Sequence, residues 1–415
     1  MRVLLLGSGA REHALARAIV GSPLLNQLTI SPGNPGMREL GLLVPLPTIT
    51  DVLDWLVQHP TDLVVIGPEA PLAAGWADAI RASGVAVFGP SQQAARLESS
   101  KAFAKSVMQH VHVPTARYRA FTDTTDAIAF VHESALAWVV KADGLAAGKG
   151  VIVAESVDET IAAIQSLGTM PAGQQLLLEE RLYGPEVSLI ALCDGTTHVV
   201  LPSSRDHKRL GDDDTGPNTG GMGTIAPLHA MNQYTAKQLG MLVIQPILDF
   251  MRIHGMPFIG ALYAGVMLTE DGPKVIEYNA RFGDPETQVI LPLCSGDVLS
   301  ALHAAAHGKL EPDSIGWLPR AAACVVVASQ GYPDAPRLGD PIHIDTANLP
   351  AEGIILHAGT TLIDGQLCSN GGRVLSAIGI GDSHAEALKT AYAVVDCISM
   401  VGMQYRLDIG QSELP

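Results

Sequence analysis

Short apolar runs alternate with amphipathic stretches through the first part of the chain. The apolar runs cover residues 2–6, 28–31, 62–67 and 85–88, and the amphipathic stretches cover residues 12–20 and 75–82. Strands that alternate with helices form βαβ units, in which the crossover helices make neighbouring strands parallel. The sequence therefore predicts an amino-terminal α/β domain built on a parallel sheet.

The length of the chain requires more than one domain. It has 415 residues, whereas a single hydrophobic core stops growing at about 250–300 residues. A Gly89-Pro90-Ser91 turn precedes a helical pair at 92–110, and a new strand pattern begins near residue 320 and ends in a helix capped by Ser383. We predict an amino-terminal α/β domain at 1–98, a central domain at 99–319 with a small mobile subdomain at about 114–183, and a carboxy-terminal α+β domain at 320–415.

The composition excludes several classes of protein. A formal net charge of −16 repels the phosphates of nucleic acids and membranes, so we expect no nucleic-acid partner and no membrane association. A hydrophobic share of 47% excludes a disordered chain, and no apolar run reaches the roughly 18 residues of a membrane span. The start of the chain turns polar too soon for a signal peptide, so we expect a cytoplasmic protein with reduced cysteines.

A glycine-rich turn, Gly7-Ser8-Gly9, follows the first predicted strand and opens the first predicted helix. Backbone amides at a helix start bind phosphates, and the pattern is close to that of a dinucleotide-binding loop. Glu12 replaces the third glycine of that pattern, however, and the second strand lacks the acid that would bind a ribose. We favour a phosphate or small anionic substrate with Arg11 supplying charge; glycines that serve only strand-to-helix packing are the alternative.

Residues 141–151, KADGLAAGKGV, form a second glycine-rich turn, which we call the flap. It differs from a P-loop because three residues separate Gly144 from Gly148, and because Gly150 stands where a P-loop has Ser or Thr. The turn joins two predicted strands, so we predict that its amides and Lys149 close over phosphates. The alternative is an ordinary hairpin turn, which would leave two lysines and three glycines unexplained.

A hairpin is predicted around Asp271-Gly272, and its second strand, at 274–279, carries polar side chains with a period of two. Alternation along the strand places Glu277, Asn279 and Arg281 on one face. The carboxylate and the amide oxygen suit Mg²⁺ bound to nucleotide phosphates, and the guanidinium suits an anionic substrate. The alternative is a solvated polar face on an edge strand.

Two long polar stretches, at 204–209 and 211–223, are predicted to be loops. Long loops without secondary structure are usually functional or disordered. Mixed charges followed by repeated Gly favour a loop that folds over a small polar ligand. Asp206, with Arg205 or Lys208, is the candidate contact, and a solvated surface loop is the alternative.

Eight motifs together resemble the phosphoribosylamine–glycine ligase family, also called glycinamide ribonucleotide synthetase, across essentially the whole chain. They are GSGAREHAL at 7–15, SPGNPG at 31–36, IGPEAPL at 66–72, KADGLAAGKGV at 141–151, DHKR at 206–209, DTGPNTGGMG at 214–223, VIEYNARFGDPE at 275–286 and NGGRV at 370–374. The resemblance implies a Rossmann-like pre-ATP-grasp domain, a central ATP-grasp domain with a mobile flap subdomain, and a carboxy-terminal α+β domain. It also implies ATP-dependent ligation of glycine to 5-phosphoribosylamine in purine biosynthesis, through a glycyl phosphate intermediate.

The resemblance further implies residues that bind ATP and metal. The ATP-binding positions are Lys101, Lys141, Gly148, Lys149 and Gly150 around the phosphates, and Glu179, Glu180, Leu182 and Glu186 around the adenosine. Glu277 and Asn279 match the pair that binds Mg²⁺ or Mn²⁺. The preceding strand reads Tyr263-Ala264-Gly265-Val266-Met267 where ATP-grasp enzymes often have a further acid, which leaves the remaining metal ligand unassigned.

Substrate-binding and catalytic residues follow from the same motifs. The substrate-binding positions are Gly9, Gly33, Asn34, Pro35, Gly36 and Glu69 on the amino-terminal side, and Asp206, Gly220 and Arg281 on the central side. Arg281, Asp206 and Lys149 are expected to act in catalysis. No enzyme nucleophile is implied, because transfer of a phosphoryl group to a carboxylate needs alignment and charge neutralisation.

Three other functions remain as alternatives. Another ATP-grasp ligase or carboxylating enzyme of purine synthesis would use the flap and the metal pair equally, but the motifs at 206–209 and 214–223 fit glycine ligation better. An intact flap and metal pair disfavour a non-catalytic nucleotide sensor, and a Rossmann oxidoreductase would have to bind NAD or FAD. We expect a monomer that makes transient contact with the amidotransferase supplying phosphoribosylamine.

Overall fold

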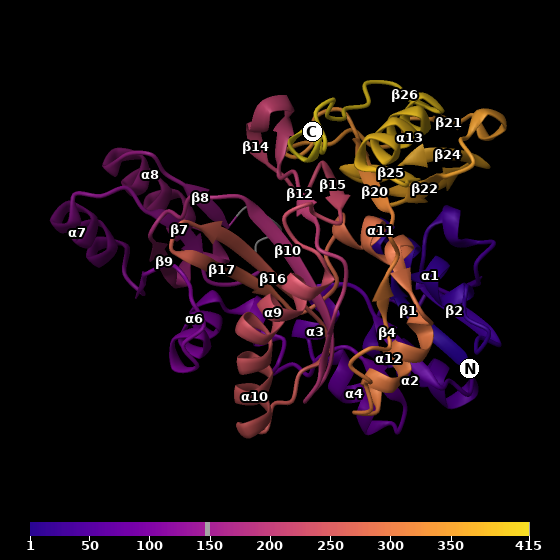
Figure 1. Cartoon of the computed structure of the whole chain (residues 1–415), viewed down its shortest axis with the longest axis horizontal. Coiled ribbons are helices and arrows are strands. Elements are labelled where there is room, and N and C mark those ends of the chain that lie inside the picture. Colours follow the sequence, from indigo (N-terminus) through magenta and orange to yellow (C-terminus); the bar gives the residue numbers. More distant parts are fainter. Residues whose placement is uncertain (146–149, 415) are drawn as a thin grey trace.

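The computed structural model describes residues 1–145 and 150–414. In Figure 1 the amino-terminal and carboxy-terminal elements lie on one side of a central sheet, and a small subdomain with α7 and α8 extends to the other side. This mixture of parallel and antiparallel sheets with helices confirms the predicted multidomain α/β and α+β class. No helix of the described part is long and apolar enough to cross a membrane.

The amino-terminal part forms the predicted parallel sheet. Its strands lie in the order β3-β2-β1-β4-β5 and are β1 (Arg2–Gly7), β2 (Gln27–Pro32), β3 (Leu42–Leu43), β4 (Leu63–Ile66) and β5 (Ala86–Phe88). The connecting helices are α1 (Ala10–Val20), α2 (Ile49–Gln58), α3 (Glu69–Ala73) and α4 (Trp76–Ala82). Adjacent residues such as Leu4 and Leu5 are both fully buried, because helices cover both faces of a parallel sheet.

A small antiparallel sheet carries the flap. Helices α5 (Arg96–Ser99) and α6 (Lys101–His110) lead to strands β6 (Tyr118–Phe121), β7 (Val139–Ala142), β8 (Val151–Val153) and β9 (Leu176–Glu179), in the order β6-β9-β7-β8. Helices α7 (Thr124–Ser134) and α8 (Val157–Gly168) pack on this sheet around a core of their own that includes Ile164 and Leu178. As predicted, the two strands that flank the flap pair with each other.

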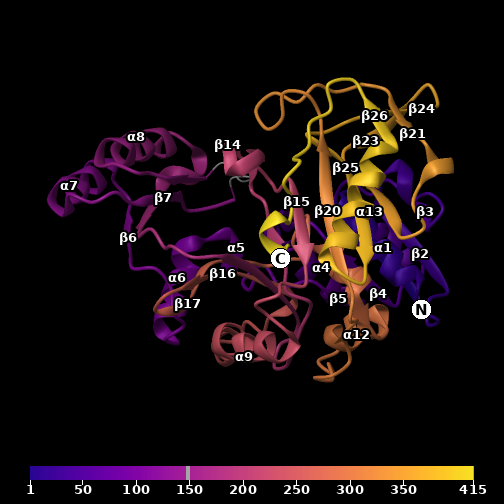
Figure 2. The same cartoon turned by 45° about the horizontal axis from the view of Figure 1, so that its top comes forward.

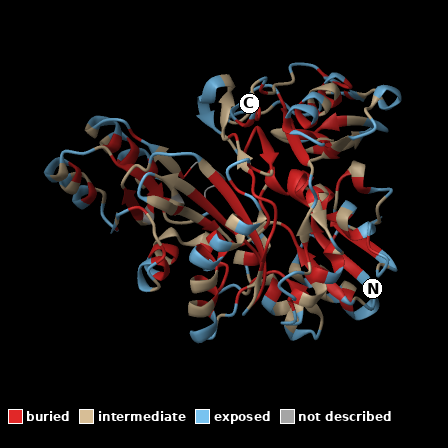
Figure 3. Cartoon of the chain, viewed as in Figure 1, coloured by how far each residue is buried: buried red, intermediate tan, exposed pale blue. Residues whose placement is uncertain are grey.

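The central sheet is antiparallel, in the order β11-β10-β16-β17. Its strands are β10 (Glu186–Asp194), β11 (His198–Val200), β16 (Ile259–Thr269) and β17 (Gly272–Asn279), and α9 (Gln233–Val243), α10 (Gln245–Ile253), α11 (Glu286–Ile290) and α12 (Val298–Ala306) complete this part. The predicted hairpin at Asp271-Gly272 is confirmed, and Gly272 has a φ of +108°, which favours glycine. Strands β10 and β16 are buried over most of their length (Figure 3).

The stretches predicted to be polar loops contain strands instead. The structure has β12 (Arg205–Asp206), the hairpin of β13 (Arg209–Gly211) and β14 (Thr215–Asn218), and β15 (Gly223–Ala226). The loop prediction is therefore wrong. Strands this short show no clear alternation of apolar and polar residues, and one of the two partners of β15 lies far along the chain.

That partner is β20 (Ala321–Ala328), the first long strand of the carboxy-terminal part. With β22 (Gly353–His357) and β25 (Arg373–Gly381) it forms a sheet in the order β12-β15-β20-β25-β22, covered by α13 (His384–Asp396) (Figure 2). Ser383 caps α13 as predicted, since its hydroxyl accepts a hydrogen bond from the Glu386 amide at 3.2 Å. The remaining short strands are β18 (Cys294–Ser295), β19 (Gly316–Trp317), β21 (Ile342–Ile344), β23 (Thr360–Ile363), β24 (Gln366–Ser369) and β26 (Ile398–Met400).

Candidate active site

A lysine stands at the base of the flap. Lys101 is the first residue of α6, and its Nζ donates to the carbonyl oxygens of Ala142 at 3.0 Å and Gly144 at 3.1 Å. Burial lowers the pKa of Lys101, and the carboxylate of Glu277 acts in the opposite direction. The ammonium group therefore lies where the flap leaves β7, close to the predicted metal ligand.

Lys141 belongs to a buried group with Glu179 and Lys105. Its Nζ donates to Oε2 of Glu179 at 3.0 Å and to the carbonyl oxygen of Ile276 at 3.2 Å. The Nζ of Lys105 lies 2.8 Å from the same carboxylate oxygen. Burial lowers the pKa of Lys105 to about 8, against the attraction of Glu179. The Glu179 side chain thus orients two ammonium groups, one of which, on Lys105, is not among the predicted site residues.

The segment predicted to bind adenosine connects the small subdomain to the central sheet. The carboxylate of Glu180 accepts hydrogen bonds from the amide and the Nε of Arg117, at 3.0 and 2.6 Å. Leu182 is half-buried in the connection, and Glu186 begins β10 and forms an ion pair with Lys208. These residues border the junction of two sheets.

Glu277 and Asn279 lie on the same face of β17. They are paired with Gly265 and Tyr263 of β16, so the position opposite Glu277 has no side chain. Among the described residues no three His, Cys, Asp or Glu side chains gather into a metal site. A carboxylate and an amide oxygen on one strand face would fit a cation whose other ligands are phosphate oxygens and water, which is how Mg²⁺ is usually bound with nucleotides.

The charge around Glu277 is positive. Burial alone would raise the pKa of its carboxyl, but Lys208, Lys141, Lys101 and Arg281 together lower it below its ordinary value. The carboxylate is therefore ionised at neutral pH, as a metal ligand must be. The same cations would attract the negative charge of a nucleoside triphosphate.

A cavity of about 440 Å³ opens at the carboxyl end of the parallel strands, the usual ligand position in open α/β sheets. It is lined by Leu6, Gly7, Ser8, Gly9, Arg11, Glu12, Ser31, Pro32, Leu46, Pro47, Pro68, Glu69, Pro71, Trp76 and Asp284. The predicted substrate residues Gly9 and Glu69 thus line the same cavity, together with Asp284 from the central part.

Glu12 occupies the start of α1, where a dinucleotide would place its phosphates. Its Oε2 accepts a hydrogen bond from the Gly9 amide at 2.7 Å, and its Oε1 accepts one from Nε of Arg11 at 2.5 Å. A Cβ on Gly67 would lie 2.1 Å from Oε1, so this glycine is needed for the close approach. The Glu12 carboxylate therefore accepts hydrogen bonds from the Gly9 amide and the Arg11 guanidinium, two groups that were predicted to bind an anionic ligand.

Arg281 lies between two carboxylates. Its Nε is 3.3 Å from Oε1 of Glu98 and 3.6 Å from Oε2 of Glu69. Glu98 also accepts a hydrogen bond from the Ala280 amide at 2.7 Å. Burial would lower the pKa of Arg281, but the two carboxylates raise it, so the guanidinium remains charged. Arg281 therefore links the end of the metal-binding strand to the wall of the cavity.

Asp206 faces a second acid, Glu286. Oδ1 of Asp206 is shielded from solvent and has no hydrogen-bond partner within the described residues, whereas Glu286 accepts a hydrogen bond from Oγ of Ser188 at 3.1 Å. Burial and repulsion by Glu286 raise the pKa of Asp206 well above its ordinary value, and burial also raises the pKa of Glu286. Buried oxygens rarely lack a donor, so this pair fits an amino group supplied by a ligand.

Gly220 contacts residues of the carboxy-terminal part. Its amide donates to the hydroxyl of Tyr332 at 2.9 Å. Arg373, which lies in the NGGRV motif, donates from Nη1 to the Asp284 carbonyl oxygen at 2.8 Å and pairs with the Asp284 carboxylate at 3.1 Å. All three parts of the chain therefore contribute to the site.

The Gly33-Asn34-Pro35-Gly36 turn is fastened on two sides. Nδ2 of Asn34 donates to the carbonyl oxygens of Ser8 and His357, both at 2.8 Å. A Cβ on Gly36 would lie 2.4 Å from the ring of His357. The turn is therefore held between the cavity wall and the carboxy-terminal sheet.

The His13–His357 contact beside this turn predicts a pH dependence of stability. The His357 amide donates to Nδ1 of His13 at 3.0 Å; burial, reinforced by His357, lowers the pKa of His13 to about 3. The unfolded chain binds this proton near pH 6.5, so the free energy of unfolding falls as the pH falls from 6.5 toward 3. The substitution His13→Asn keeps a hydrogen-bond acceptor but removes the titrating imidazole. Between pH 7 and pH 5 we expect the free energy of unfolding of this variant to fall by about 2 kcal/mol less than that of the wild type.

Urea unfolding at the two pH values measures this difference. His132→Asn is the matched control, because His132 is exposed on α7. Equal losses in His13→Asn and the wild type would contradict the assignment of a neutral, buried His13.

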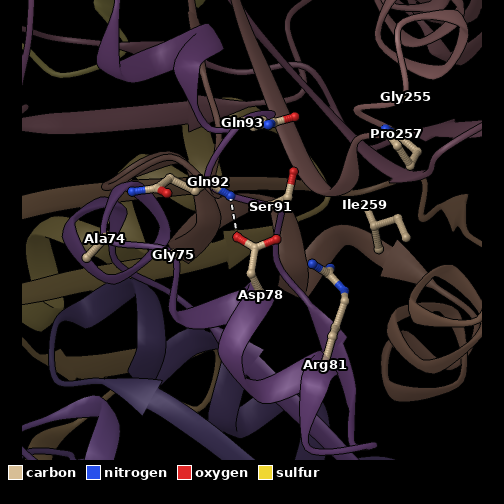
Figure 4. A pocket seen from close by; sticks show the side chains of 10 residues that line it. All are labelled: Ala74, Gly75, Asp78, Arg81, Ser91, Gln92, Gln93, Gly255, Pro257 and Ile259. Atoms are coloured by element: carbon tan, nitrogen blue, oxygen red, sulfur yellow. Dashed lines mark hydrogen bonds between the residues drawn. The ribbon is translucent and has the colours of Figure 1, made fainter.

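A second cavity of about 550 Å³ lies apart from these residues, between α4, the turn at 91–93 and the residues that lead into β16, 255–259 (Figure 4). Asp78 accepts a hydrogen bond from the Gln92 amide at 2.7 Å, and Nη2 of Arg81 donates to the Val87 carbonyl oxygen at 3.2 Å. None of the predicted site residues lines this cavity. Its charged groups contact the protein itself, so it is not assigned to the site.

The predicted residues gather into two neighbouring groups. The nucleotide group contains Lys101, Lys141, Glu179, Glu277 and Asn279, and the substrate group contains Gly9, Glu69, Asp206, Gly220 and Arg281. Gly148 and Lys149 lie outside the described residues, and Gly150 accepts a hydrogen bond from the Ala142 amide at 2.8 Å.

Sequence reasoning missed Glu98, Lys105, Asp284, Glu286, His357 and Arg373 as individual site residues. Asp284 and Glu286 stand inside the VIEYNARFGDPE motif and Arg373 inside NGGRV, so those motifs held a usable signal. The other three become neighbours of the site only through contacts between distant segments.

Comparison with protein-family models covers nearly the whole chain. Residues 1–98 match the phosphoribosylglycinamide synthetase N domain, residues 99–287 the ATP-grasp (A) domain, and residues 322–412 the C domain. A phosphoribosylamine–glycine ligase of Rhizobium meliloti (strain 1021) is 46% identical, with 99% of this chain and 98% of that protein aligned. The trifunctional purine biosynthetic protein adenosine-3 of Gallus gallus is 44% identical over 99% of this chain and 42% of its own length.

Solved structures agree with the sequence comparison. The crystal structure of a phosphoribosylamine–glycine ligase from Thermotoga maritima has a TM-score of 0.86 and 35% identity, covering 99% of this chain and all of that one. A biotin carboxylase from Campylobacter jejuni has a TM-score of 0.75 at 13% identity, covering 97% and 92% of the two chains, and so shares the fold alone. Since family models and full-length relatives agree from end to end, the chain belongs to the phosphoribosylglycinamide synthetase family of ATP-grasp ligases.

Proposed function

We propose that this chain ligates glycine to 5-phosphoribosylamine at the expense of ATP, giving glycinamide ribonucleotide, ADP and phosphate in purine biosynthesis. The observation that carries the proposal is the position of Arg281. It follows the predicted metal pair by two residues and lies 3.6 Å from Glu69 in the wall of the cavity. A nucleotide bound at the metal pair and a substrate bound in the cavity would therefore meet at this arginine.

The residues suit two successive displacements. In the first, a glycine carboxylate oxygen bonds to the γ-phosphorus of ATP, ADP leaves, and glycyl phosphate forms. In the second, the amine nitrogen of phosphoribosylamine bonds to the acyl carbon, phosphate leaves, and the nitrogen loses a proton. Lys101 and Lys141 neutralise the transferred phosphoryl charge, and Lys149 is proposed to join them from the flap. Asp206 Oδ1 receives a substrate amino group, and its raised pKa suits it to accept the proton.

Glu277 and Asn279 are proposed to hold the metal. Bound there, Mg²⁺ or Mn²⁺ would neutralise phosphate charge and align the oxygens of ATP. Carboxylate and amide oxygens accept either ion, so the donor set supports both. Glu179, Glu180, Leu182 and Glu186 are proposed to enclose the adenosine, supported by their place at the junction of two sheets.

We propose a cytoplasmic monomer with the domain limits predicted from the sequence. A transient contact with the amidotransferase that makes phosphoribosylamine is proposed because this amine is labile and benefits from direct delivery.

The test is release of ADP and phosphate from ATP, with phosphoribosylamine generated in situ and glycine and the amine omitted in turn. We expect release that requires both substrates and is matched by glycinamide ribonucleotide. Release without glycine would instead indicate another ATP-grasp reaction, and no release with every component present would indicate a nucleotide sensor.

A further inference from the structure

Arg406 is buried at the carboxy-terminal end of the chain, with 2% of its side chain exposed. Its Nε and Nη2 donate to the two carboxylate oxygens of Asp408, at 2.7 and 2.6 Å. Its Nη1 donates to Oδ1 of Asp214 at 2.7 Å and to the carbonyl oxygen of Arg209 at 3.2 Å. Donation from Arg406 lowers the pKa of Asp408 to about 2, so the pair stays charged. A bidentate pair of this kind fixes both distance and orientation.

The turn that Arg406 reaches has an unfavourable backbone. Asp213 and Asp214, between β13 and β14, have φ values of +54° and +51°. Residues with a Cβ are rare in this left-handed region and remain there only when their surroundings hold them. The surroundings are the carboxy-terminal segment, residues 406–413. Asp408 accepts a hydrogen bond from the Asp213 amide at 2.9 Å, and the Leu407 amide donates to Asp212 at 2.8 Å.

The same segment also fastens both neighbours of Asp206. Arg205 donates from Nη1 to Oγ of Ser412 at 2.9 Å and lies 2.8 Å from the carboxylate of Glu413. The Gly410 amide donates to Nε2 of His207 at 3.1 Å. The segment lies beside β14 and β15 in both views (Figures 1 and 2), and β15 pairs with β12. Asp206 therefore stands between two residues whose side chains are anchored to the end of the chain.

Lys208 follows in the connection between β12 and β13 and contacts the nucleotide side of the site. Its Nζ pairs with Glu186, and its charge lowers the pKa of Glu277. Lys208 therefore has an anchor of its own in β10, and loss of the contacts to residues 406–413 would displace Asp206 on the substrate side more than Lys208 on the nucleotide side.

We propose that the carboxy-terminal segment positions β12, which carries Asp206, with Arg406 as the central positioning residue; this rests on the proposed ligase function. The side chain of Arg406 contacts Asp408, Arg209 and Asp214, and it acts by holding the Asp212–Asp214 turn. If the segment only stabilised the carboxy-terminal part, loss of its contacts would lower the free energy of unfolding. It would not raise the KM for one substrate more than the KM for another.

The test compares Arg406→Met with Arg320→Met. Arg320 forms ion pairs with Glu352 at 3.1 Å and Asp382 at 3.2 Å, in the same part of the chain but away from the turn. We expect Arg406→Met to raise the KM for phosphoribosylamine and glycine roughly tenfold to a hundredfold, because small displacements of binding groups have effects of this size. The KM for ATP should change less than twofold, and Arg320→Met should leave all three unchanged. An equal rise in all three KM values, or the same profile in both variants, would overturn the proposal.

A second readout does not depend on activity. Trypsin cleaves after Lys208 and Arg209, and we expect it to cut Arg406→Met there faster than it cuts the wild type or Arg320→Met. The double variant Arg406→Met with Asp408→Asn also removes the carboxylate that would be left unpaired, and we expect it to keep the melting temperature of the wild type. Equal cleavage in all variants would overturn the positioning role. A wild-type chain without ligase activity would overturn the proposed function, and cleavage would still decide whether Arg406 holds the strand.

Discussion

Glu277→Gln is expected to reduce kcat/KM by a factor on the order of 10²–10³ without unfolding the protein, because a neutral amide binds a divalent cation weakly. The carboxylate lies among Lys101, Lys141 and Lys208, which lower its pKa. Its removal relieves no repulsion and leaves those lysines close to the bound phosphates. The variant should therefore need much more Mg²⁺ for the same turnover.

Turnover measured against Mg²⁺ concentration at fixed ATP shows this shift. Glu270→Gln is the matched control, since Glu270 is exposed at the turn of the same hairpin. We also expect MgATP to stabilise the wild type and the control against thermal unfolding more than it stabilises Glu277→Gln. Near-normal turnover of Glu277→Gln at limiting Mg²⁺ would refute the metal assignment.

Arg281→Met is expected to abolish measurable turnover and to lower stability. The substitution leaves Glu98, whose side chain is 8% exposed, and Glu69 without their shared cation. Breaking a buried ion pair from one side costs about 3–5 kcal/mol. Loss of activity alone would not separate a catalytic role from this structural cost.

The double variant Arg281→Met with Glu98→Gln separates the two. Glutamine keeps an acceptor for the Ala280 amide but carries no charge, so we expect urea unfolding close to that of the wild type. Turnover should remain absent, while Glu98→Gln alone should keep most of it. Recovery of both stability and turnover in the double variant would show that Arg281 serves only the structure.

The sequence predicts best those features that depend on residues close together in the chain. Alternating apolar runs indicated the parallel sheet, Asp271-Gly272 indicated the β16–β17 hairpin, and Ser383 indicated the start of α13. Each depends on a local backbone preference that tertiary packing reinforces. No helix was predicted over residues 233–253, although α9 and α10 lie there.

Part of the site also follows from residues close together in the chain, and the rest depends on contacts between distant segments. Glu277 and Asn279 share a strand face, so their proximity follows from the period of a strand. Asn34 reaches the carbonyl oxygen of His357 across 323 residues, and Arg406 reaches Asp214 across 192. No pattern in one sequence shows such contacts, because chain folding rather than residue spacing creates them. The family resemblance, which the comparisons confirm, supplied what local patterns did not.

The sheet shared by the central and carboxy-terminal parts limits how this chain can be recombined with its relatives. Family models divide the chain between residues 287 and 322, yet β15 and β20 are hydrogen-bonded neighbours across that division. A chimera that took only residues after the division from a relative would set a foreign β20 against a native β15, inside a buried apolar layer. The unit of exchange is therefore the whole sheet with its β12 and β15 strands, even though those strands lie far upstream in the sequence.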